Sequence, residues 1–321
     1  MKKTVLFIMG MGGPDSIEAI EPFLFNLFSD RDIIDFHAGN TLQKFIAKKI
    51  AAKRSKKLSP EYLKMGYNGA SPQNIIHRRI FKALEKYYTE NTGRQLQIIE
   101  ANCYYHPFFN EALKVLEMTE CERVIFTTVY PQYSLTTVEA CFNRLAKIYN
   151  ISGNNKYKSV VIPYWYENEK YCTAISKRIL QAAEKLNKDI KDCHVLYSAH
   201  SVPLSYVEKG DPYPEHVRHH TDIINKMTGI QSFDTAYQSK VGPVKWLRPA
   251  VIETLESYKE KNIDNIIIVP ISFISDHIET LIELDEQLIP ILKNAGRNIV
   301  RIESLNDSPD FIEALSDIIT I

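Results

Sequence analysis

Short and almost continuously apolar runs, rich in β-branched residues, alternate with longer amphipathic stretches along this chain of 321 residues. Runs that are apolar at every position, and not at every second one, are typical of strands in a parallel sheet that helices cover on both faces. Right-handed β-α-β crossovers usually connect such strands. The pattern therefore predicts an α/β protein. The predicted strands are Thr4–Met9, Gln97–Ala101, Val124–Val129, Ser159–Pro163, His194–Ala199 and Ile266–Ile271.

A polar stretch at residues 150–158 (NISGNNKYK) is the best candidate for a linker between domains. At ~150 residues per domain, the chain has room for two domains. We therefore expect an N-terminal domain over residues 1–152 and a C-terminal domain over residues 153–321. Open parallel sheets bind ligands beyond the carboxyl ends of their strands, so the residues that follow each strand are the first candidates for a site.

Charge and cysteine content exclude several classes of function. The 39 Lys and Arg balance the 39 Asp and Glu, so the chain lacks the basic excess of a nucleic-acid-binding protein. None of the 5 cysteines forms a Cys-x-x-Cys pair, which argues against a zinc ribbon or a disulfide framework and favours a reducing, cytoplasmic setting. No apolar stretch approaches the ~20 residues that cross a bilayer.

The first predicted strand ends in Gly10-Met11-Gly12-Gly13-Pro14. A glycine-rich loop before a helix can bind phosphate, but this spacing is not Gly-x-Gly-x-x-Gly, and Pro14 has no N–H to donate. The alternative is a tight turn that lets the backbone approach a flat ligand. The polarisable thioether of Met11 at the tip suits an apolar ring face, so we favour this second interpretation.

Histidines and acidic residues follow two strands of the second half. His200 comes directly after one apolar run, and a histidine there is more often structural than catalytic. After the next run, four acidic residues recur at spacings of three, four and three, which predicts one helix face. A capping box explains the first two, and a solvated face is the usual explanation for such a row. Because the row begins beside His277 at the expected ligand-binding edge, metal or proton handling becomes the sharper hypothesis. The four are Asp276, Glu279, Glu283 and Glu286.

A second histidine group, His216, His219 and His220, has a spacing that could hold zinc, but no third ligand accompanies it, so a surface helix is the better interpretation. Basic residues gather over residues 44–57 with no acid between them and with apolar residues interleaved. A solvated helix face explains such a segment. A contact with a membrane surface or with acidic ligand groups is the alternative.

Taken together and in this order, the motifs resemble the ferrochelatase family. The motifs are Gly10–Pro14, Gly69–Pro72, Tyr130–Ser134, Ser198–His200, Lys209–Pro214, Gln238–Pro243, Trp246–Leu247, Ser275–Leu281 and Ser304–Pro309. The resemblance implies a chelatase-like fold of two Rossmann-like domains, in which the last helix, about residues 308–320, packs back on the N-terminal domain. It also implies insertion of Fe²⁺ into protoporphyrin IX with release of two protons, the final step of haem b synthesis.

The resemblance also implies roles for individual residues. His200 matches the proton acceptor and Glu279 its partner carboxylate, with His200, Glu279 and Glu283 as the ligands of the incoming iron. Asp276 and His277 match residues that orient Glu279. The residues expected to bind the porphyrin are Met11, Lys53, Arg54, Tyr62, Ser71, Tyr130, Tyr133 and Trp246.

Departures from the family pattern refine the expectation. Met11 favours protoporphyrin IX, because the coproporphyrin III branch tends to carry Tyr there. Ser55 stands in the place of a second arginine, and Cys103 stands where relatives usually have Arg. Leu135 replaces one cluster ligand and the chain has no cysteine-bearing tail, so we expect no [2Fe–2S] cluster and no cofactor beyond the substrate Fe²⁺.

Other functions stay open at this point. They are a coproporphyrin III ferrochelatase, a cobalt chelatase, and a non-catalytic porphyrin or haem carrier. A carrier needs no base beside an acidic row, which argues for the enzyme. We expect a cytoplasmic protein with a peripheral contact to the inner face of the membrane and no nucleic-acid partner. The sequence does not predict an oligomeric state.

Overall fold

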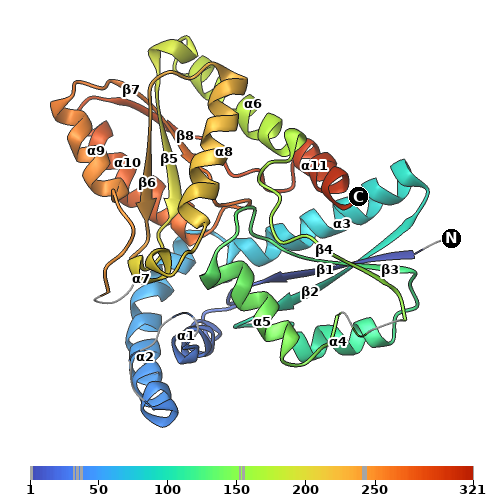
Figure 1. Cartoon of the computed structure of the whole chain (residues 1–321). Helices are drawn as coiled ribbons and strands as arrows, with labels where there is room; N and C mark the ends of the chain where they lie inside the picture. The colour runs from blue at the N-terminus through green and yellow to red at the C-terminus, as the bar shows by residue number, and fades with distance from the viewer. Residues whose placement is uncertain are drawn as a thin grey trace. The chain divides into compact units, whose positions relative to one another are not determined.

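The computed structural model describes residues 3–31, 33, 36, 39–151, 153, 156–240 and 244–320. The chain forms two compact units, and each is described by itself. The first unit runs to Tyr164 and takes in the end of the chain from Ile319, whereas the second spans Trp165–Ile318. Each unit holds one four-stranded parallel sheet with helices packed against it, as Figure 1 shows, which confirms the predicted α/β class.

The sheet of the first unit has the strand order β2-β1-β3-β4. Its strands are β1 (Lys3–Gly10), β2 (Gln95–Asn102), β3 (Arg123–Thr128) and β4 (Lys158–Val161). Gly10 pairs with Asn102 and Met9 with Thr128, so β1, β2 and β3 end at the same level. The crossovers change direction between β1 and β3. This is the point at which open parallel sheets bind ligands, so the loops after β1 and β3 form the candidate edge.

The end of the first unit differs from the expected boundary between residues 152 and 153. Lys158 pairs with Arg123 and Val161 with Phe126, so β4 completes the first sheet. The polar stretch 150–158, in which residues 152, 154 and 155 lie outside the described part, therefore leads from α5 into β4 of the same unit. In the sequence, the short strand β4 looks like the start of a new domain because it follows a polar stretch. In the structure it is the edge strand of the first sheet.

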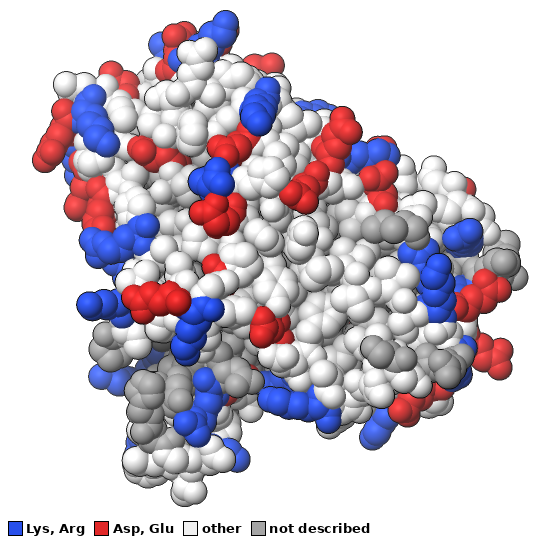
Figure 2. Space-filling view, in the orientation of Figure 1, with Lys and Arg blue, Asp and Glu red and all other residues white. Residues whose placement is uncertain are grey.

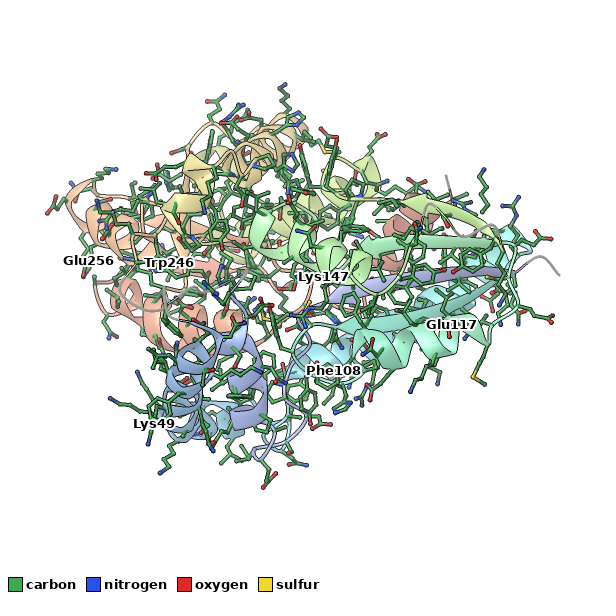
Figure 3. All side chains as sticks on the ribbon, turned by 60° about the horizontal axis from the view of Figure 1, so that its bottom comes forward. Lys49, Phe108, Glu117, Lys147, Trp246 and Glu256 are labelled. Atoms are coloured by element: carbon green, nitrogen blue, oxygen red, sulfur yellow. The ribbon has the colours of Figure 1, made fainter. Side chains whose placement is uncertain are left out.

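Helices complete the first unit. They are α1 (Ile20–Ser29), α2 (Asn40–Lys64), α3 (Pro72–Thr92), α4 (Phe109–Glu117), the π-helix η1 (Leu135–Glu139) and α5 (Ala140–Ala146). Helix α2 packs against α1 through a buried stripe with a period of four, formed by Gln43, Ala47, Ala51 and Ser55. The small side chains of this stripe let the two helices approach closely, and the Gln43 amide donates to the Phe28 carbonyl at 2.9 Å. The opposite face of α2 carries the predicted basic segment, and Lys49 points outward from it in Figure 3.

The second unit repeats the same arrangement with the strand order β6-β5-β7-β8. Its strands are β5 (His194–His200), β6 (Phe233–Gln238), β7 (Asn265–Pro270) and β8 (Asn298–Arg301). β5 and β7 were predicted from their apolar runs. β6 and β8 were not predicted, because polar residues interrupt both. His200 pairs with Gln238, which brings the ends of β5 and β6 side by side.

Helices cover both faces of the second sheet, with α9 and α10 on one side and α6 and α8 on the other (Figure 1). The helical segments are α6 (Glu169–Lys185), η2 (Ile190–Asp192), α7 (Leu204–Glu208), α8 (Tyr213–Thr228), α9 (Val251–Glu260), the π-helix η3 (Glu279–Leu288), α10 (Ile289–Lys293) and α11 (Pro309–Ile319). Side chains of α11 bind α6, since Lys170 lies 2.8 Å from Glu313 and Arg178 lies 3.2 Å from Asp310. Packing of the last helix on the first domain stays a prediction.

The turn after β1 yields a test of the fold. Gly12 has a φ of 76°, and an added Cβ would lie 2.9 Å from the Asn102 Cβ, whereas Gly93 has a φ of 66° and open space around it. Left-handed backbone costs an L-residue about 1–2 kcal/mol, and overpacking adds about 1–3 kcal/mol. We expect Gly12→Ala to lower the free energy of unfolding, measured in urea, clearly more than the control Gly93→Ala does. Equal losses would show that the turn does not pack against Asn102 in this way.

Candidate active site

The central residue of the site is His200, the last residue of the middle strand β5. Its Nδ1 lies 2.5 Å from the Ser201 carbonyl oxygen, which can only accept a hydrogen bond. Nδ1 therefore carries a proton, and Nε2 is the atom that can take up or release one. Nε2 faces the Glu279 carboxylate, with 3.4 Å between it and Oε1. This side chain is 38% exposed, so a ligand can reach it.

The partner Glu279 begins the π-helix η3, in the segment that follows β7. Its Oε2 lies 3.7 Å from Nε2 of His277, whose Nδ1 donates to the Ser275 carbonyl at 3.1 Å. One carboxylate thus lies between two imidazoles, and the Phe273 ring packs against both of them. Within the described residues, Oε2 accepts no hydrogen bond although it is buried. The arrangement therefore directs one oxygen of Glu279 to His200 and the other toward His277.

Electrostatics sets the protonation of this pair. Burial works against charge on either group, but the Glu279 carboxylate outweighs it and raises the pKa of His200 to about 9. Burial likewise opposes the ionised carboxylate, yet His200 and His277 hold the pKa of Glu279 well below its usual range. At neutral pH the free protein therefore carries an imidazolium and a carboxylate in contact.

Glu283 lies four residues further along η3 and is held by the end of β6. Ser239 donates to it twice, from its N–H at 3.0 Å and from its hydroxyl at 2.6 Å. Gln238 links the two acids, because its amide donates to the Glu279 carbonyl at 2.9 Å and to Glu283 at 3.4 Å. Burial, followed by the negative charge of Glu279, raises the pKa of Glu283 against these donors. Of the two glutamates of the site, Glu283 therefore binds a proton more readily than Glu279 does.

The expected acidic helix face is only half present. Asp276 precedes the helix, and its carboxylate accepts from Arg301 at 2.8 Å and from Asn306 at 2.9 Å, away from Glu279. Glu286 is exposed. The reason is the helix type: a π-helix bonds residue i to residue i+5, so its wider turns keep the spacing of four on one face but not the spacing of seven. The structure therefore brings Glu279 and Glu283 together and separates them from the two outer acids.

No three His, Cys, Asp or Glu side chains in the described ranges are grouped so that they could hold a metal ion. Iron ligation by His200, Glu279 and Glu283 accordingly stays a prediction about a substrate ion that passes through. The second histidine group packs around Tyr166 instead, with His220 buried and His219 3.0 Å from Glu167.

Sequence reasoning assigned no role to Gln238 or Ser239, although both lie in a motif of the resemblance. Their hydrogen bonds to η3 depend on β6, a strand with mixed polarity that the apolar pattern does not reveal. A strand assignment over Phe233–Gln238 would have placed both residues beside His200.

In the first unit, three of the expected porphyrin-binding residues lie at the ends of β1 and β3. Met11 is half-buried, and its carbonyl accepts from the Tyr104 N–H at 3.0 Å. The Ser71 N–H donates to the Pro14 carbonyl at 2.7 Å, which ties α3 to the Met11 loop. Tyr130 follows β3 and is half-buried. These residues therefore share the edge at which the crossovers change direction.

The other expected porphyrin residues are held differently. The Arg54 guanidinium lies 5.5 Å from the Phe28 ring centre, and burial, opposed by Glu61, lowers its pKa. Lys53 is exposed. Tyr62 is buried in α2, and Tyr133 donates to Glu139 at 2.8 Å. Trp246, labelled in Figure 3, pairs with Pro203 by a β-bridge, and its buried Nε1 has no hydrogen-bond partner in the described part of the chain.

Two of the departures from the family pattern, Ser55 and Cys103, are internal. Ser55 lies in the buried stripe of α2, so the much larger arginine side chain would not fit there without a local rearrangement. Cys103 is buried with its sulfur 3.7 Å from that of Cys141. Arg144 donates to the Cys103 carbonyl at 3.1 Å, so a guanidinium reaches this place from α5.

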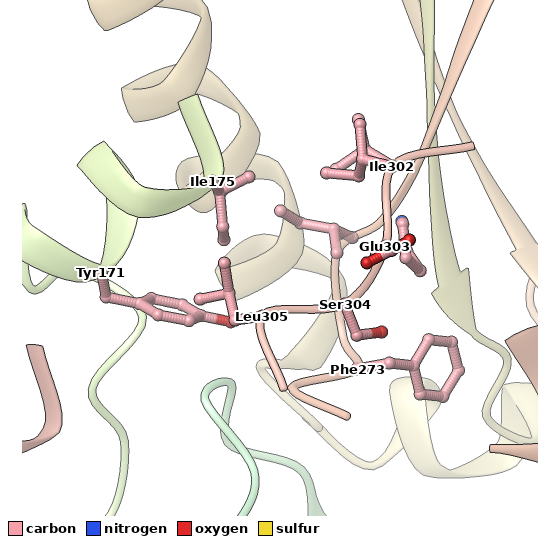
Figure 4. Close-up of a pocket in the computed structure, with 10 residues that line it drawn as sticks. Tyr171, Ile175, Phe273, Ile302, Glu303, Ser304 and Leu305 are labelled. Atoms are coloured by element: carbon pink, nitrogen blue, oxygen red, sulfur yellow. The ribbon is translucent and has the colours of Figure 1, made fainter. Parts of the chain in front are cut away.

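A small cavity lies next to the site in the second unit (Figure 4). Its volume is about 10 Å³, roughly the room for one water molecule. Tyr171, Ile175, Ile302 and Leu305 line it, together with Phe273, whose ring also contacts His200. The cavity is far too small for a macrocycle.

In the described ranges, no helix is both long and apolar enough to cross a membrane.

The sequence matches the family model described as Ferrochelatase over residues 3–321. The chain belongs to the ferrochelatase family. A ferrochelatase of Citrifermentans bemidjiense is 37% identical over 318 residues, which cover 99% of this chain and 98% of the relative. A ferrochelatase of Aquifex aeolicus is 37% identical over 320 residues, covering 99% of each. This ferrochelatase is thus a metal chelatase of haem synthesis, with a porphyrin and iron as its substrates.

Solved structures support the fold of this ferrochelatase. SirB from Bacillus subtilis, solved with Fe³⁺, aligns with a TM-score of 0.54 at 9% identity and covers 100% of this chain and 95% of that protein. DR2241 from Deinococcus radiodurans, described as similar to chelatases with two additional domains, aligns with a TM-score of 0.53 at 8% identity. It covers 99% of this chain and 54% of that protein. The predicted chelatase-like fold is confirmed.

The geometry of the pair predicts how His200 titrates. We expect ring ¹⁵N and ¹³C NMR signals of His200 to report a pKa near 9, and Glu279→Gln to lower it, because the substitution removes the charge that stabilises the imidazolium. His220, whose pKa burial lowers to about 3, is the internal control and is expected to stay neutral in both proteins. A pKa for His200 near its usual value in the unsubstituted enzyme would contradict this geometry.

Proposed function

We propose that this chelatase inserts Fe²⁺ into protoporphyrin IX and releases protohaem and two protons. The observation that carries the proposal is the contact between His200 and Glu279 at the carboxyl end of β5, with Glu283 beside them. Metallation requires that two pyrrole nitrogens lose their protons to nearby groups. A basic imidazole nitrogen and two carboxylates at one sheet edge meet that requirement.

The first proton goes to Nε2 of His200 in this proposal. In the free enzyme Glu279 favours the imidazolium, so Nε2 must first pass the proton that it holds to Glu283 or to water. Each of the two pyrrole protons then takes the same route, from the pyrrole nitrogen to Nε2 and from there to Glu283 or water. A divalent cation near the Glu279 carboxylate would offset the negative charge that raises the pKa of His200. Arrival of iron would therefore free the base at the time when the pyrrole nitrogens must be deprotonated.

Glu283 is the proposed acceptor for protons that leave the site. Its pKa lies above the usual value, so it binds a proton more readily than an ordinary surface glutamate does. Gln238 bridges the Glu279 main chain and the Glu283 carboxylate, which keeps the two acids in one arrangement. Glu283 can also offer an oxygen to a hard cation, so the proton and metal roles share this residue.

Met11 supports protoporphyrin IX as the porphyrin. A thioether can lie against an apolar ring face, and protoporphyrin IX has only two propionates, which leaves most of its edge apolar. The main chain of the Met11 loop is fixed by Tyr104 and Ser71, so this contact is preorganised. Lys53 and Arg54 on α2 supply the cationic groups that we assign to the propionates. Coproporphyrin III is the alternative substrate.

Anaerobic mixing of the enzyme with Fe²⁺ and each porphyrin, followed by visible absorption, tests the proposal. We expect kcat/KM to be about tenfold or more higher for protoporphyrin IX than for coproporphyrin III. His200→Ala is expected to lose about 100-fold or more in kcat while it still binds porphyrin, since a general base contributes that much. His219→Ala, a histidine of the same unit that lies outside the site, is the matched control.

Two results would overturn the proposal. Faster metallation of coproporphyrin III would assign the other substrate, and near-normal turnover by His200→Ala would remove this histidine as the base. Met11→Tyr tests the choice of substrate separately from the general base, because it is expected to weaken the preference for protoporphyrin IX while His200 stays in place.

We also propose that the outer face of α2 makes the peripheral membrane contact. Lysines lie exposed along this helix, and Leu42, Phe45 and Leu63 are 53%, 59% and 57% exposed among them. Several blue side chains lie among white ones in the part of Figure 2 where Figure 1 places α2. Cationic and apolar side chains on one helix face suit an anionic bilayer surface, to which each lysine adds about 1 kcal/mol.

Co-sedimentation with vesicles tests this contact. We expect the enzyme to sediment with vesicles that contain anionic lipid at low salt and to be released at high salt, since screening weakens the attraction. The double variant Leu42→Ser, Phe45→Ser is expected to bind more weakly, whereas Met118→Ser, which changes an 86% exposed apolar residue on α4's end, is the control. Equal binding of all three proteins, or none at low salt, would argue against the contact.

A further inference from the structure

Arg301, the last residue of β8, is a nearly buried cation beside the site, with a side chain that is only 6% exposed. Its Nη1 donates to Asp276 at 2.8 Å. Its Nε and Nη2 donate to the two oxygens of Asp285 at 2.8 and 2.7 Å, a bidentate contact. One guanidinium thus joins two carboxylates from different parts of the chain, and paired charges at this depth hold their geometry tightly.

The two carboxylates bracket the catalytic segment. Asp276 comes immediately before His277 and three residues before Glu279, and Asp285 comes two residues after Glu283. Asn306 strengthens the first contact, since it donates to the Asp276 carboxylate at 2.9 Å and accepts from the Asp276 N–H at 2.8 Å. Arg301 therefore binds both ends of the segment that carries Glu279 and Glu283.

The helix type explains why such a grip matters. π-Helical turns are rare and occur mostly at functional sites, and a segment released from its contacts would relax toward the α-helix. Relaxation would rotate Glu283 relative to Glu279 and change the distances of 3.4 Å to His200 and 2.6 Å to Ser239. A displacement of about 1 Å can cost about 100-fold in rate.

We infer that Arg301 is a positioning residue, which holds η3 so that Glu279 meets His200 and Glu283 meets Ser239. It touches neither the base nor the acids of the site and acts through Asp276 and Asp285. The inference rests on the proposed roles of Glu279 and Glu283. It adds a requirement that neither role contains, namely a cation behind the helix that fixes both carboxylates.

Arg297 provides a matched control from the opposite end of the same strand. It directly precedes β8, and it pairs with Asp264 and the Lys259 carbonyl. Asp264 directly precedes β7 and Lys259 lies in α9, so this pair is at the amino ends of the strands. Arg297→Gln therefore removes an arginine–aspartate pair of the same unit without touching η3.

The experiment compares Arg301→Gln, Arg301→Lys and Arg297→Gln in the full-length enzyme. We expect Arg301→Gln to lower kcat by about 10- to 100-fold with little change in the KM or fluorescence-measured affinity for porphyrin. We also expect it to shift the His200 ring signals in NMR, because Glu279 moves away from Nε2. Arg301→Lys is expected to recover part of kcat, since an ammonium can pair with one carboxylate but not with both as the guanidinium does. Arg297→Gln should change none of these.

A folded Arg301→Gln enzyme with normal kcat and unshifted His200 signals would overturn the inference, even where His200→Ala is inactive. The NMR comparison needs no turnover, so it decides the matter also if the proposed reaction fails. Should Arg301→Gln not fold, Asp285→Asn takes its place, because it removes one arm at a half-exposed position and leaves Arg301 paired with Asp276. Unchanged kcat and His200 signals in Asp285→Asn would then count against the inference.

Discussion

The contact between Glu279 and His200 is the interaction on which the rest of the site depends. Burial disfavours the charged forms of both Glu279 and His200, and only their attraction to each other offsets this cost. Their pairing needs two separate elements at the right level, the end of the middle strand β5 and the beginning of the π-helix η3. The parallel sheet places His200 at the carboxyl ends of the strands, where β5 and β6 end side by side. The orientation of η3 is fixed by two hydrogen bonds, from Ser239 after β6 to Glu283 and from Arg301 of β8 to Asp285.

Glu283 adds a second carboxylate to the His200–Glu279 pair. Burial, followed by the negative charge of Glu279 four residues away on the same helix, raises the pKa of Glu283, whereas Glu279 stays ionised beside His200. Neighbouring groups whose pKa values are pushed apart by their surroundings can take different acid and base roles. In the proposed mechanism, iron near Glu279 would offset the charge that holds the proton on His200. Metal entry would then be coupled to proton release by side chains of the second unit.

Much of the fold could be predicted because apolar runs are a strong signal. Six of the eight strands in the described part of the chain were predicted, and β6 and β8 were missed because polar residues interrupt them. Gln238 ends β6, Ser239 directly follows it and Arg301 ends β8, so these residues escaped sequence reasoning as well. His200 was a candidate because it directly follows an apolar run, and Glu279 because it lies in the acidic row after the next run. Their catalytic roles came from the family resemblance and stay predictions. Asp276 and Glu286 were predicted on the same helix face as Glu279, but Asp276 lies before the helix begins, and Glu286 is turned away because a spacing of seven does not return to the same face of a π-helix.

A structure of the enzyme with bound free-base protoporphyrin tests the central claim most directly, because the claim is about which atoms meet the pyrrole nitrogens. The account predicts that the centre of the ring lies within about 3.2 Å of Nε2 of His200, or one water molecule away from it, with the Glu279 carboxylate on the same side of the macrocycle. A ring centre that lies beyond the reach of both side chains, or His200 on the rim of the macrocycle, would contradict it.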